Sequence, residues 1–370
     1  MKDFTLFAVS FLLSSILTPL AARIATRNKI LDYPESRKMH HRPTPLLGGV
    51  AVYLGFLLTV SLDAPHTKPF VGVLLGSTLI FFVSLVDDIR ELSVFYRLMF
   101  QLLGSTIMLL YGVKVSFLPP GLWGDTGEII ITLLWIIGIT NAMNFLDGLD
   151  GLVGGLSAIT GVFFYIVARQ VHQIYFGRLA LIMAGASAGF LPYNFPVPFF
   201  YLNRILTGKK KGTPEGGHAR IFLGDSGATF LGAFYAGISM MGDLASQNVI
   251  ALTVPVLLLG IPIFDMTLIT IMRMREGQVS NLGTWLSYAG KDHFHHRLVD
   301  LGFSRGGAVF FIYCVAVTLG IDAVILRRVS PFDAFLLLFK VSLIFVLIAL
   351  LIVTGKRAAS EEGKRERKIL

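Results

Sequence analysis

Residues 130–150, IITLLWIIGITNAMNFLDGLD, join a long apolar run to a cluster of amides and carboxylates. The apolar part is typical of a transmembrane helix, which needs about 20 predominantly apolar residues. Asn141, Asn144, Asp147 and Asp150 then recur every third residue. Residues three apart are neighbours on a helix surface. The stretch therefore predicts a membrane helix with one polar ridge at an end.

Two other apolar runs also carry carboxylates at their ends. Residues 71–88 finish with Asp87 and Asp88, and Asp225 lies near the start of residues 222–241. A carboxylate at the centre of a bilayer costs roughly 2.5–3.5 kcal/mol, and less near the interface. Five acidic residues at three segment ends, counting Asp147 and Asp150, therefore suggest a shared cation or a shared reaction.

The composition is that of a membrane protein. Of 370 residues, 54% are hydrophobic and 15% are charged, and the mean hydropathy is +0.71. We predict an all-α, polytopic helical bundle with about eleven transmembrane helices over residues 1–354, followed by a basic tail at 355–370. The predicted spans are 3–22, 46–62, 70–86, 98–113, 128–146, 152–168, 177–195, 226–242, 249–270, 308–326 and 333–354.

The charges follow these spans, which argues against nucleic-acid binding. If the amino terminus lies outside, the inner segments hold twenty-four of the 32 Lys and Arg residues. The positive-inside rule therefore predicts the amino terminus outside and the carboxyl terminus in the cytoplasm. All five carboxylates then fall on the cytoplasmic face.

Each acidic group also has a structural interpretation. Asp87 and Asp88 could form an interfacial turn paired with Arg90, and Asp225 could simply cap a helix. The polar ridge could serve as hydrogen bonds between helices. For Asp265, in PIFDM, an ion pair with a neighbouring helix is the preferred interpretation.

A second polar cluster lies in KDHFHHRL, near the end of the last long inner loop. It contains His293, His295, His296 and Arg297. Carboxylates and amides favour a hard cation such as Mg²⁺ over zinc, so we interpret this cluster as a grip on phosphate and sugar, with a structural role as the alternative. Acidic groups beside cationic donors suit phosphoryl chemistry on a phosphorylated substrate reached from the cytoplasm, with a lipid co-substrate.

Several ordered motifs together resemble the polyprenyl-phosphate N-acetylhexosamine-1-phosphate transferase family. They are LVDDIREL, NAMNFLDGLDGL, IFLGDSGATFLG, PIFDM and HFHHRLVDLGFS, and the similarity runs from about residue 32 to residue 303. Within the family the chain is most similar to undecaprenyl-phosphate N-acetylglucosamine-1-phosphate transferases. One difference is Glu91, which replaces the last Asp of the family's DDxxD pattern.

The resemblance implies a reaction and roles for individual residues. UDP-N-acetylglucosamine and undecaprenyl phosphate would give undecaprenyl diphosphate N-acetylglucosamine and UMP, with Mg²⁺ or Mn²⁺. Asp225 and Asn144 would bind the metal, and Asp87 and Asp88 would flank the lipid phosphate. The implied catalytic set also includes Asp147 and Asp150, and the implied substrate contacts are Asn141, Asp150, His293, His295, His296 and Arg297.

The same resemblance implies a multi-pass enzyme of the bacterial cytoplasmic membrane that starts a cell-envelope polysaccharide and could form a homodimer. Two alternatives remain at this point. One is the phospho-N-acetylmuramoyl-pentapeptide transferase of peptidoglycan synthesis, which has the same chemistry with another sugar. The other is a secondary transporter, although transporters bind near the bilayer midplane and often show internal repeats, whereas these acids lie at segment ends.

Overall fold

The computed structural model describes residues 2–34, 42–63, 67–195, 219–241, 249–277, 293–326 and 329–369, without the side chains of 249–252, 331 and 355–369. The helices are α1 (Lys2–Arg27), α2 (Gly48–Val60), α3 (Lys68–Arg90), α4 (Val94–Leu110), α5 (Leu122–Leu146), α6 (Leu152–Gln170), α7 (Ile174–Asn194), α9 (Gly224–Ser239), α10 (Val249–Leu258), α11 (Gly260–Arg275), α13 (Phe294–Asp300), α14 (Arg305–Leu326) and α15 (Pro331–Ile369). A short antiparallel pair joins β1 (Leu31–Asp32) to β2 (Thr44–Pro45).

The helices confirm an all-α polytopic membrane protein. Seven of them are long and apolar enough to cross a membrane, namely α1, α3, α5, α6, α7, α14 and residues 332–354 of α15, while α2 and α4 are apolar but shorter. The predicted ninth span consists of two helices, α10 and α11, which meet at Leu259. The count of eleven crossings and the orientation of the termini stay predictions.

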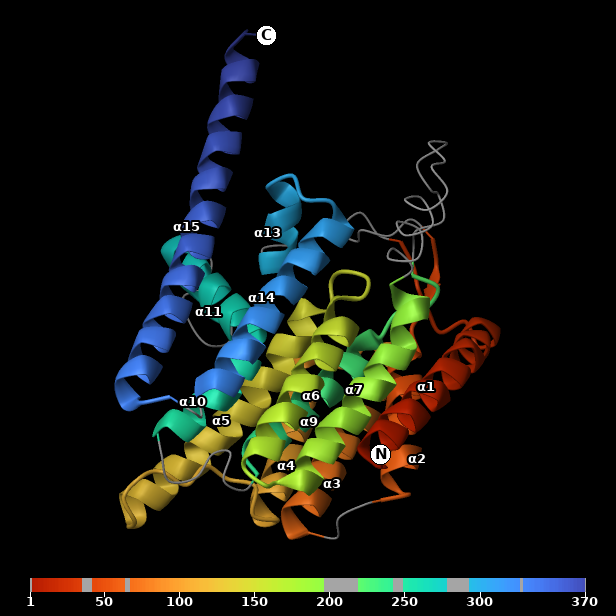
Figure 1. Cartoon of the computed structure of the whole chain (residues 1–370). Coiled ribbons are helices and arrows are strands. Elements are labelled where there is room, and N and C mark those ends of the chain that lie inside the picture. The colour runs from red at the N-terminus through yellow and green to blue at the C-terminus, as the bar shows by residue number, and fades with distance from the viewer. Residues whose placement is uncertain are drawn as a thin grey trace.

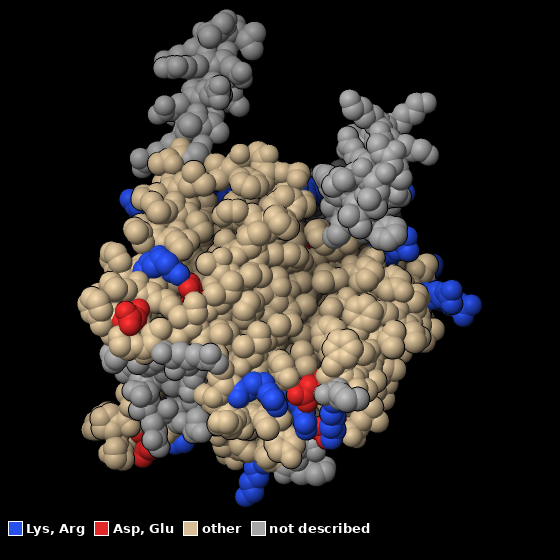
Figure 2. Space-filling model, in the orientation of Figure 1, with Lys and Arg blue, Asp and Glu red and all other residues tan. Residues whose placement is uncertain are grey.

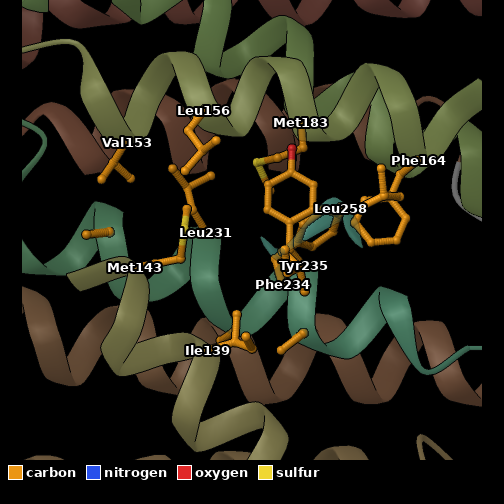
Figure 3. Packing of buried hydrophobic residues seen from close by; sticks show 14 of the residues in the cluster. Ile139, Met143, Val153, Leu156, Phe164, Met183, Leu231, Phe234, Tyr235 and Leu258 are labelled. Atoms are coloured by element: carbon orange, nitrogen blue, oxygen red, sulfur yellow. The ribbon is translucent and has the colours of Figure 1, made fainter. Parts of the chain in front are cut away.

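Helix α9 is the centre of the bundle. Apart from Asp225, every residue of α9 is buried, and the helix packs against α2, α3 and α5. Figure 3 shows Leu231 and Tyr235 of α9 between residues of α5, such as Ile139, and residues of α6, such as Leu156. A helix that is apolar all round is expected to be buried. Its 16 residues span about 24 Å at 1.5 Å per residue.

Small residues bring α9 close to α5. A Cβ atom added at Gly232 would lie 2.8 Å from the Cα atom of Thr140, so a larger side chain would separate the two helices. Close backbone approach of this kind is common between membrane helices. The approach sets the amino-terminal end of α9 beside the carboxyl-terminal end of α5.

A short backbone ladder fixes the start of α9. The amide of Phe222 donates to the carbonyl oxygen of Pro45 at 2.8 Å, and the amides of Gly48 and Gly49 donate to the carbonyl oxygens of Phe222 and Leu223 at 2.9 and 2.7 Å. These bonds join the segment before α9 to the segment before α2. The position of Asp225 is therefore set by backbone contacts as well as by packing.

The arrangement of charge fits a protein surrounded by lipid. Figure 2 shows a broad area in the centre of the face in view without Lys, Arg, Asp or Glu, with the charged residues toward the edges of the view. Figure 1 shows α13 and the carboxyl-terminal end of α15 at the same end of the bundle. Many of the basic residues on which the orientation was predicted lie at 35–41, 196–218 and 278–292, outside the described residues.

Candidate active site

The carboxylate of Asp87 is held by two donors at the end of α3. The Leu92 amide donates to Asp87 Oδ1 at 2.5 Å, and Arg97 Nη1 donates to Asp87 Oδ2 at 3.1 Å. The Asp87 side chain is buried, and the helix dipole is unfavourable for an anion at a carboxyl-terminal end. Arg97 of α4 offsets that field, whereas Arg90, the partner in the structural interpretation, is exposed.

Asp88 caps a different helix. Its carboxylate oxygens accept hydrogen bonds from the amides of Asp225 and Ser226 at 2.9 and 3.1 Å. These are first-turn amides of α9, where a carboxylate is favourable. Asp225 was considered as a helix cap, but the N-cap residue of α9 is Leu223. Gly224 has φ +78°, and a Cβ atom there would lie 2.8 Å from Asp88 Oδ2, so glycine is required for this contact.

The end of α5 adds an amide and a carboxylate to the same region. Asn144 Oδ1 is buried without a hydrogen-bond partner, and the Asn144 amide lies at hydrogen-bonding distance of the Asp225 carboxylate. Burial raises the pKa of Asp147 well above its ordinary value, and the nearby carboxylates of Asp225, Asp88 and Asp150 raise it further. The structure therefore brings together the acidic ends of three segments that are far apart in the sequence.

The other two members of the polar ridge have protein partners. Asp150 Oδ2 accepts a hydrogen bond from the amide of Ala219 at 3.1 Å. Asn141 Nδ2 donates to Gln101 Oε1 at 2.7 Å, and Gln101 Nε2 donates back to Asn141 Oδ1 at 3.3 Å. This amide pair joins α4 to α5, as the interhelical interpretation of the ridge predicted. A substrate contact for Asn141 stays a prediction.

The donor set at the end of α9 fits a magnesium ion. The Asp225 side chain is 44% exposed. The Asn144 side chain, whose Oδ1 has no hydrogen-bond partner, lies beside the Asp225 carboxylate. Mg²⁺ prefers oxygen ligands and is often held by one or two carboxylates together with substrate phosphates. Within the described ranges, no group of three His, Cys, Asp or Glu side chains is placed so that it could hold a metal ion.

The histidine cluster meets the acidic end of α5 directly. His293 lies stacked on Phe145 with ring centroids 5.4 Å apart. His295 is fully buried with neither ring nitrogen hydrogen-bonded, and a Cβ atom added at Gly148 would lie 2.2 Å from its Nε2. Burial, together with the neighbouring rings of His296 and His293, holds the pKa of His295 well below its ordinary value. His295 is therefore neutral at physiological pH.

The remaining members of the cluster lie on the same short helix. Arg297 is buried in α13, and His296 is half-buried with its ring 4.2 Å from that of His295.

Glu91, the departure from the acidic motif, is an exposed residue just after α3. The motif difference therefore leaves the carboxylates of Asp87 and Asp88 in place.

The structure also adds residues that the sequence did not single out. Arg97 Nη1 lies 3.1 Å from Asp87 Oδ2 and 3.5 Å from Asp225 Oδ2. Gln101 follows Arg97 by one helical turn and fixes Asn141. Arg97 lies ten residues beyond Asp87, with a helix end between them, so no regular spacing indicated the contact.

Comparison with known proteins decides the family. The model of glycosyl transferase family 4 matches residues 70–243. A probable undecaprenyl-phosphate N-acetylglucosaminyl 1-phosphate transferase of Bacillus subtilis is 30% identical over 349 residues, which cover 93% of this chain and 90% of the relative. The chain belongs to glycosyl transferase family 4. The motifs that carried the resemblance therefore indicated the right family.

Similar proteins also occur in other bacteria. A decaprenyl-phosphate N-acetylglucosaminephosphotransferase of Mycobacterium tuberculosis is 30% identical over 325 residues, covering 78% of this chain and 74% of the relative. An undecaprenyl-phosphate alpha-N-acetylglucosaminyl 1-phosphate transferase of Yersinia pestis is 28% identical over 360 residues, covering 94% and 91%. The similarity thus extends over most of both chains.

Proposed function

We propose that this protein transfers N-acetylglucosamine 1-phosphate from UDP-N-acetylglucosamine to undecaprenyl phosphate, with release of UMP. The names of its relatives support this proposal, since each describes transfer of an N-acetylglucosamine phosphate to a polyprenyl phosphate. The product would start a cell-envelope polysaccharide in the bacterial cytoplasmic membrane, with the site facing the cytoplasm. A homodimer stays a prediction.

The convergence of three acidic segment ends around a partnerless amide oxygen carries the proposal. Asp87 and Asp88 lie in the last turn of α3, Asn144 lies in the last turn of α5 with Asp147 just after it, and Asp225 lies in the first turn of α9. A buried polar atom without a hydrogen bond is costly unless a ligand completes it. The His/Arg cluster on α13 stands beside this region and provides groups for phosphate and sugar oxygens.

Asp225 and Asn144 would hold the metal ion. A bound Mg²⁺ would neutralise part of the charge of the nucleotide diphosphate and reduce the repulsion among the carboxylates. Asp88 would act as a positioning residue, because its carboxylate fixes the turn that carries Asp225. Arg97 would reduce the repulsion between the carboxylates of Asp87 and Asp225 and hold both side chains in place.

We propose direct attack by the lipid phosphate. An oxygen of undecaprenyl phosphate would bond to the sugar-bearing phosphorus, and the bond from that phosphorus to the oxygen shared with UMP would break. A phosphate monoester is mostly ionised at neutral pH, since its second pKa is about 6, so little base catalysis is needed. Asp87 would act mainly by position, because its carboxylate already accepts from Leu92 and Arg97.

The same hydrogen bonds argue against a covalent route through Asp87 or Asp88. Each oxygen of these two carboxylates already accepts a hydrogen bond, so the oxygen that attacked phosphorus would have to weaken or lose its bond to that donor. Isotope exchange between UMP and the UDP-sugar in the absence of lipid would support a covalent phosphosugar instead. Active enzyme that shows no such exchange would favour direct transfer.

The remaining assignments follow the resemblance. Asp147 and Asp150 would order the site and contact the uridine, and His295, His296 and Arg297 would hold the diphosphate and the amino sugar. Gly148 supports this assignment, because its missing side chain lets the His295 ring lie against the loop that carries Asp147 and Asp150.

UMP release tests the proposal. Purified protein in detergent would receive UDP-N-acetylglucosamine, undecaprenyl phosphate and Mg²⁺, with Asp225→Ala as the test variant. Asp333→Ala is a matched control, since Asp333 is an exposed residue at the start of α15. We expect UMP that requires both lipid and metal, is lost in Asp225→Ala and is retained in Asp333→Ala.

Other outcomes would redirect the assignment. Release from UDP-N-acetylmuramoyl-pentapeptide, and none from UDP-N-acetylglucosamine, would move the protein to the peptidoglycan branch. No release from either nucleotide by folded protein would refute the transferase proposal. Metal binding by Asp225→Ala equal to that of the wild type would refute the metal assignment separately.

A further inference from the structure

A buried carboxylate outside the acidic segment ends holds the histidine cluster in place. Asp265 of α11 is fully buried, and both of its oxygens are used. Oδ2 lies 2.8 Å from His293 Nδ1, and Oδ1 accepts from the amide of Phe294 at 2.5 Å. Burying a charge is costly unless it is paired and hydrogen-bonded. Here both bonds go to the first residues of α13.

The position of α13 depends on these bonds. The helix has only seven residues, and a helix this short is marginal unless tertiary contacts hold it. Its N-cap residue, His293, makes no side-chain capping bond, so the carboxylate of Asp265 provides the cap from another helix. Phe264, next to Asp265, packs edge-on against Phe294 at 5.3 Å.

The same contact selects one form of the His293 ring. Nδ1 faces a carboxylate, which only accepts hydrogen bonds when ionised. Nδ1 therefore carries the proton, and Nε2 is the ring nitrogen that remains for a ligand. The ring also stacks on Phe145, the residue after Asn144. The orientation of His293 is thus fixed from α11 on one side and from α5 on the other.

We propose that Asp265 is a positioning residue for binding of the nucleotide sugar. It fixes the amino-terminal end of α13 and holds His293 so that Nε2, the unprotonated nitrogen, accepts a hydrogen bond from a hydroxyl or N–H group of the bound nucleotide sugar. The inference rests on the proposed function, and it assigns to Asp265 more than the ion pair between helices that the sequence suggested. Outer partners that orient a histidine contribute about 10–100-fold to affinity or activity at metal sites, and we expect an effect at the low end of that range.

Nucleotide-sugar affinity without lipid acceptor is the direct measurement. Asp265→Asn keeps the shape of the side chain but leaves a single acceptor oxygen, so it cannot accept from the Phe294 amide and from protonated Nδ1 at the same time. We expect the Kd for UDP-N-acetylglucosamine, measured by calorimetry with Mg²⁺, to rise about 10-fold, or 1.4 kcal/mol. Asp265→Glu, which keeps the charge, should recover part of the affinity.

A matched control separates this effect from general destabilisation. Asp322 is a buried carboxylate in α14 that pairs with Lys340 Nζ at 2.6 Å. Asp322→Asn makes the same chemical change away from α13. We expect its Kd to stay within about twofold of the wild type, because distant sites act independently. An equal rise in both variants would overturn the proposal.

Two further variants keep the test decisive if Asp265→Asn folds poorly. In His293→Asn the amide can still donate to Asp265, while the Nε2 position is removed. We expect that variant to fold and to bind about 10-fold more weakly. Wild-type affinity would show that Nε2 contacts no ligand.

The second experiment combines substitutions at Asp265 and His293. If Asp265 acts through His293, Asp265→Asn should add less than about twofold in a His293→Ala background. The same factor in both backgrounds would indicate a purely structural role. Wild-type protein that binds UDP-N-acetylmuramoyl-pentapeptide but not UDP-N-acetylglucosamine, or that binds neither nucleotide, would instead refute the proposed function.

Discussion

Replacing Gly148 by alanine should displace the buried histidine of the site. A Cβ atom at this position would lie 2.2 Å from His295 Nε2 and 3.0 Å from Cε1, whereas ordinary contacts begin at 3.4 Å. The ring would therefore have to move by about 1.2 Å. His295 is fully buried, so its neighbours must move with it. Overpacking of this kind costs typically about 1–3 kcal/mol of stability.

The effect on activity should be larger than the effect on stability. A misplacement of about 1 Å in a catalytic arrangement can cost about 100-fold in rate, and we expect a loss of that order in UMP release per folded molecule. Thermal unfolding in detergent and steady-state UMP release would be measured on the same preparations. Pairing Gly148→Ala with His295→Ser removes the clash. The double variant should therefore lose less stability than the sum of the losses in the two single variants.

Gly138→Ala is the matched control within the same membrane helix. A Cβ atom at Gly138 meets no atom within 4 Å, and alanine is favoured over glycine in a helix by about 0.5–1 kcal/mol. We expect that variant to be as active as the wild type and no less stable. If Gly148→Ala matched Gly138→Ala in both assays, the packing of His295 on the acidic loop would be wrong.

Three other predictions follow from the site. Arg97→Ala should lower kcat/KM by at least about 10-fold, because the arginine bridges carboxylates at the ends of α3 and α9. Arg90→Ala, at an exposed position, should change kcat/KM little. Equal effects of the two substitutions would show that the bridge has no role in the site. Because the pKa of His295 is depressed in the folded protein, the unfolded chain binds a proton at this residue below about pH 6.5 while the folded protein does not. Stability should therefore fall as the pH falls below that value, by up to about 1.4 kcal/mol per unit, and His295→Phe should flatten the fall in a melting series from pH 7 to pH 5. Asn144→Ala should weaken Mg²⁺ binding, measured by isothermal titration with UDP-sugar present, by about 10-fold; unchanged binding would show that its partnerless oxygen is not a ligand.

The sequence alone determined the class of fold and the residue types of the site. Apolar runs of about 20 residues have few options other than membrane helices, since the bilayer leaves no other partner for the backbone. Each of the predicted spans coincides with helix in the described structure, although the ninth breaks at Leu259. The acidic ends were visible because carboxylates are rare in such segments, and the ordered motifs indicated the family that the relatives confirm.

Tertiary structure alone decided which groups face one another. Asp87 and Asp88 are neighbours in sequence, yet one pairs with Arg97 of α4 and the other caps α9. Side chains one residue apart on a helix point about 100° apart, so their partners depend on which helices pack beside α3.

The same reason explains why Arg97, Gly148 and the Asp265–His293 pair were not recognised as parts of one site. Asp265 and His293 are separated by 28 residues, and Gly148 and His295 lie still farther apart in the chain. Sequence spacing predicts contacts within one helix, because the helix repeat is fixed. Contacts between helices depend on packing that only the folded chain establishes.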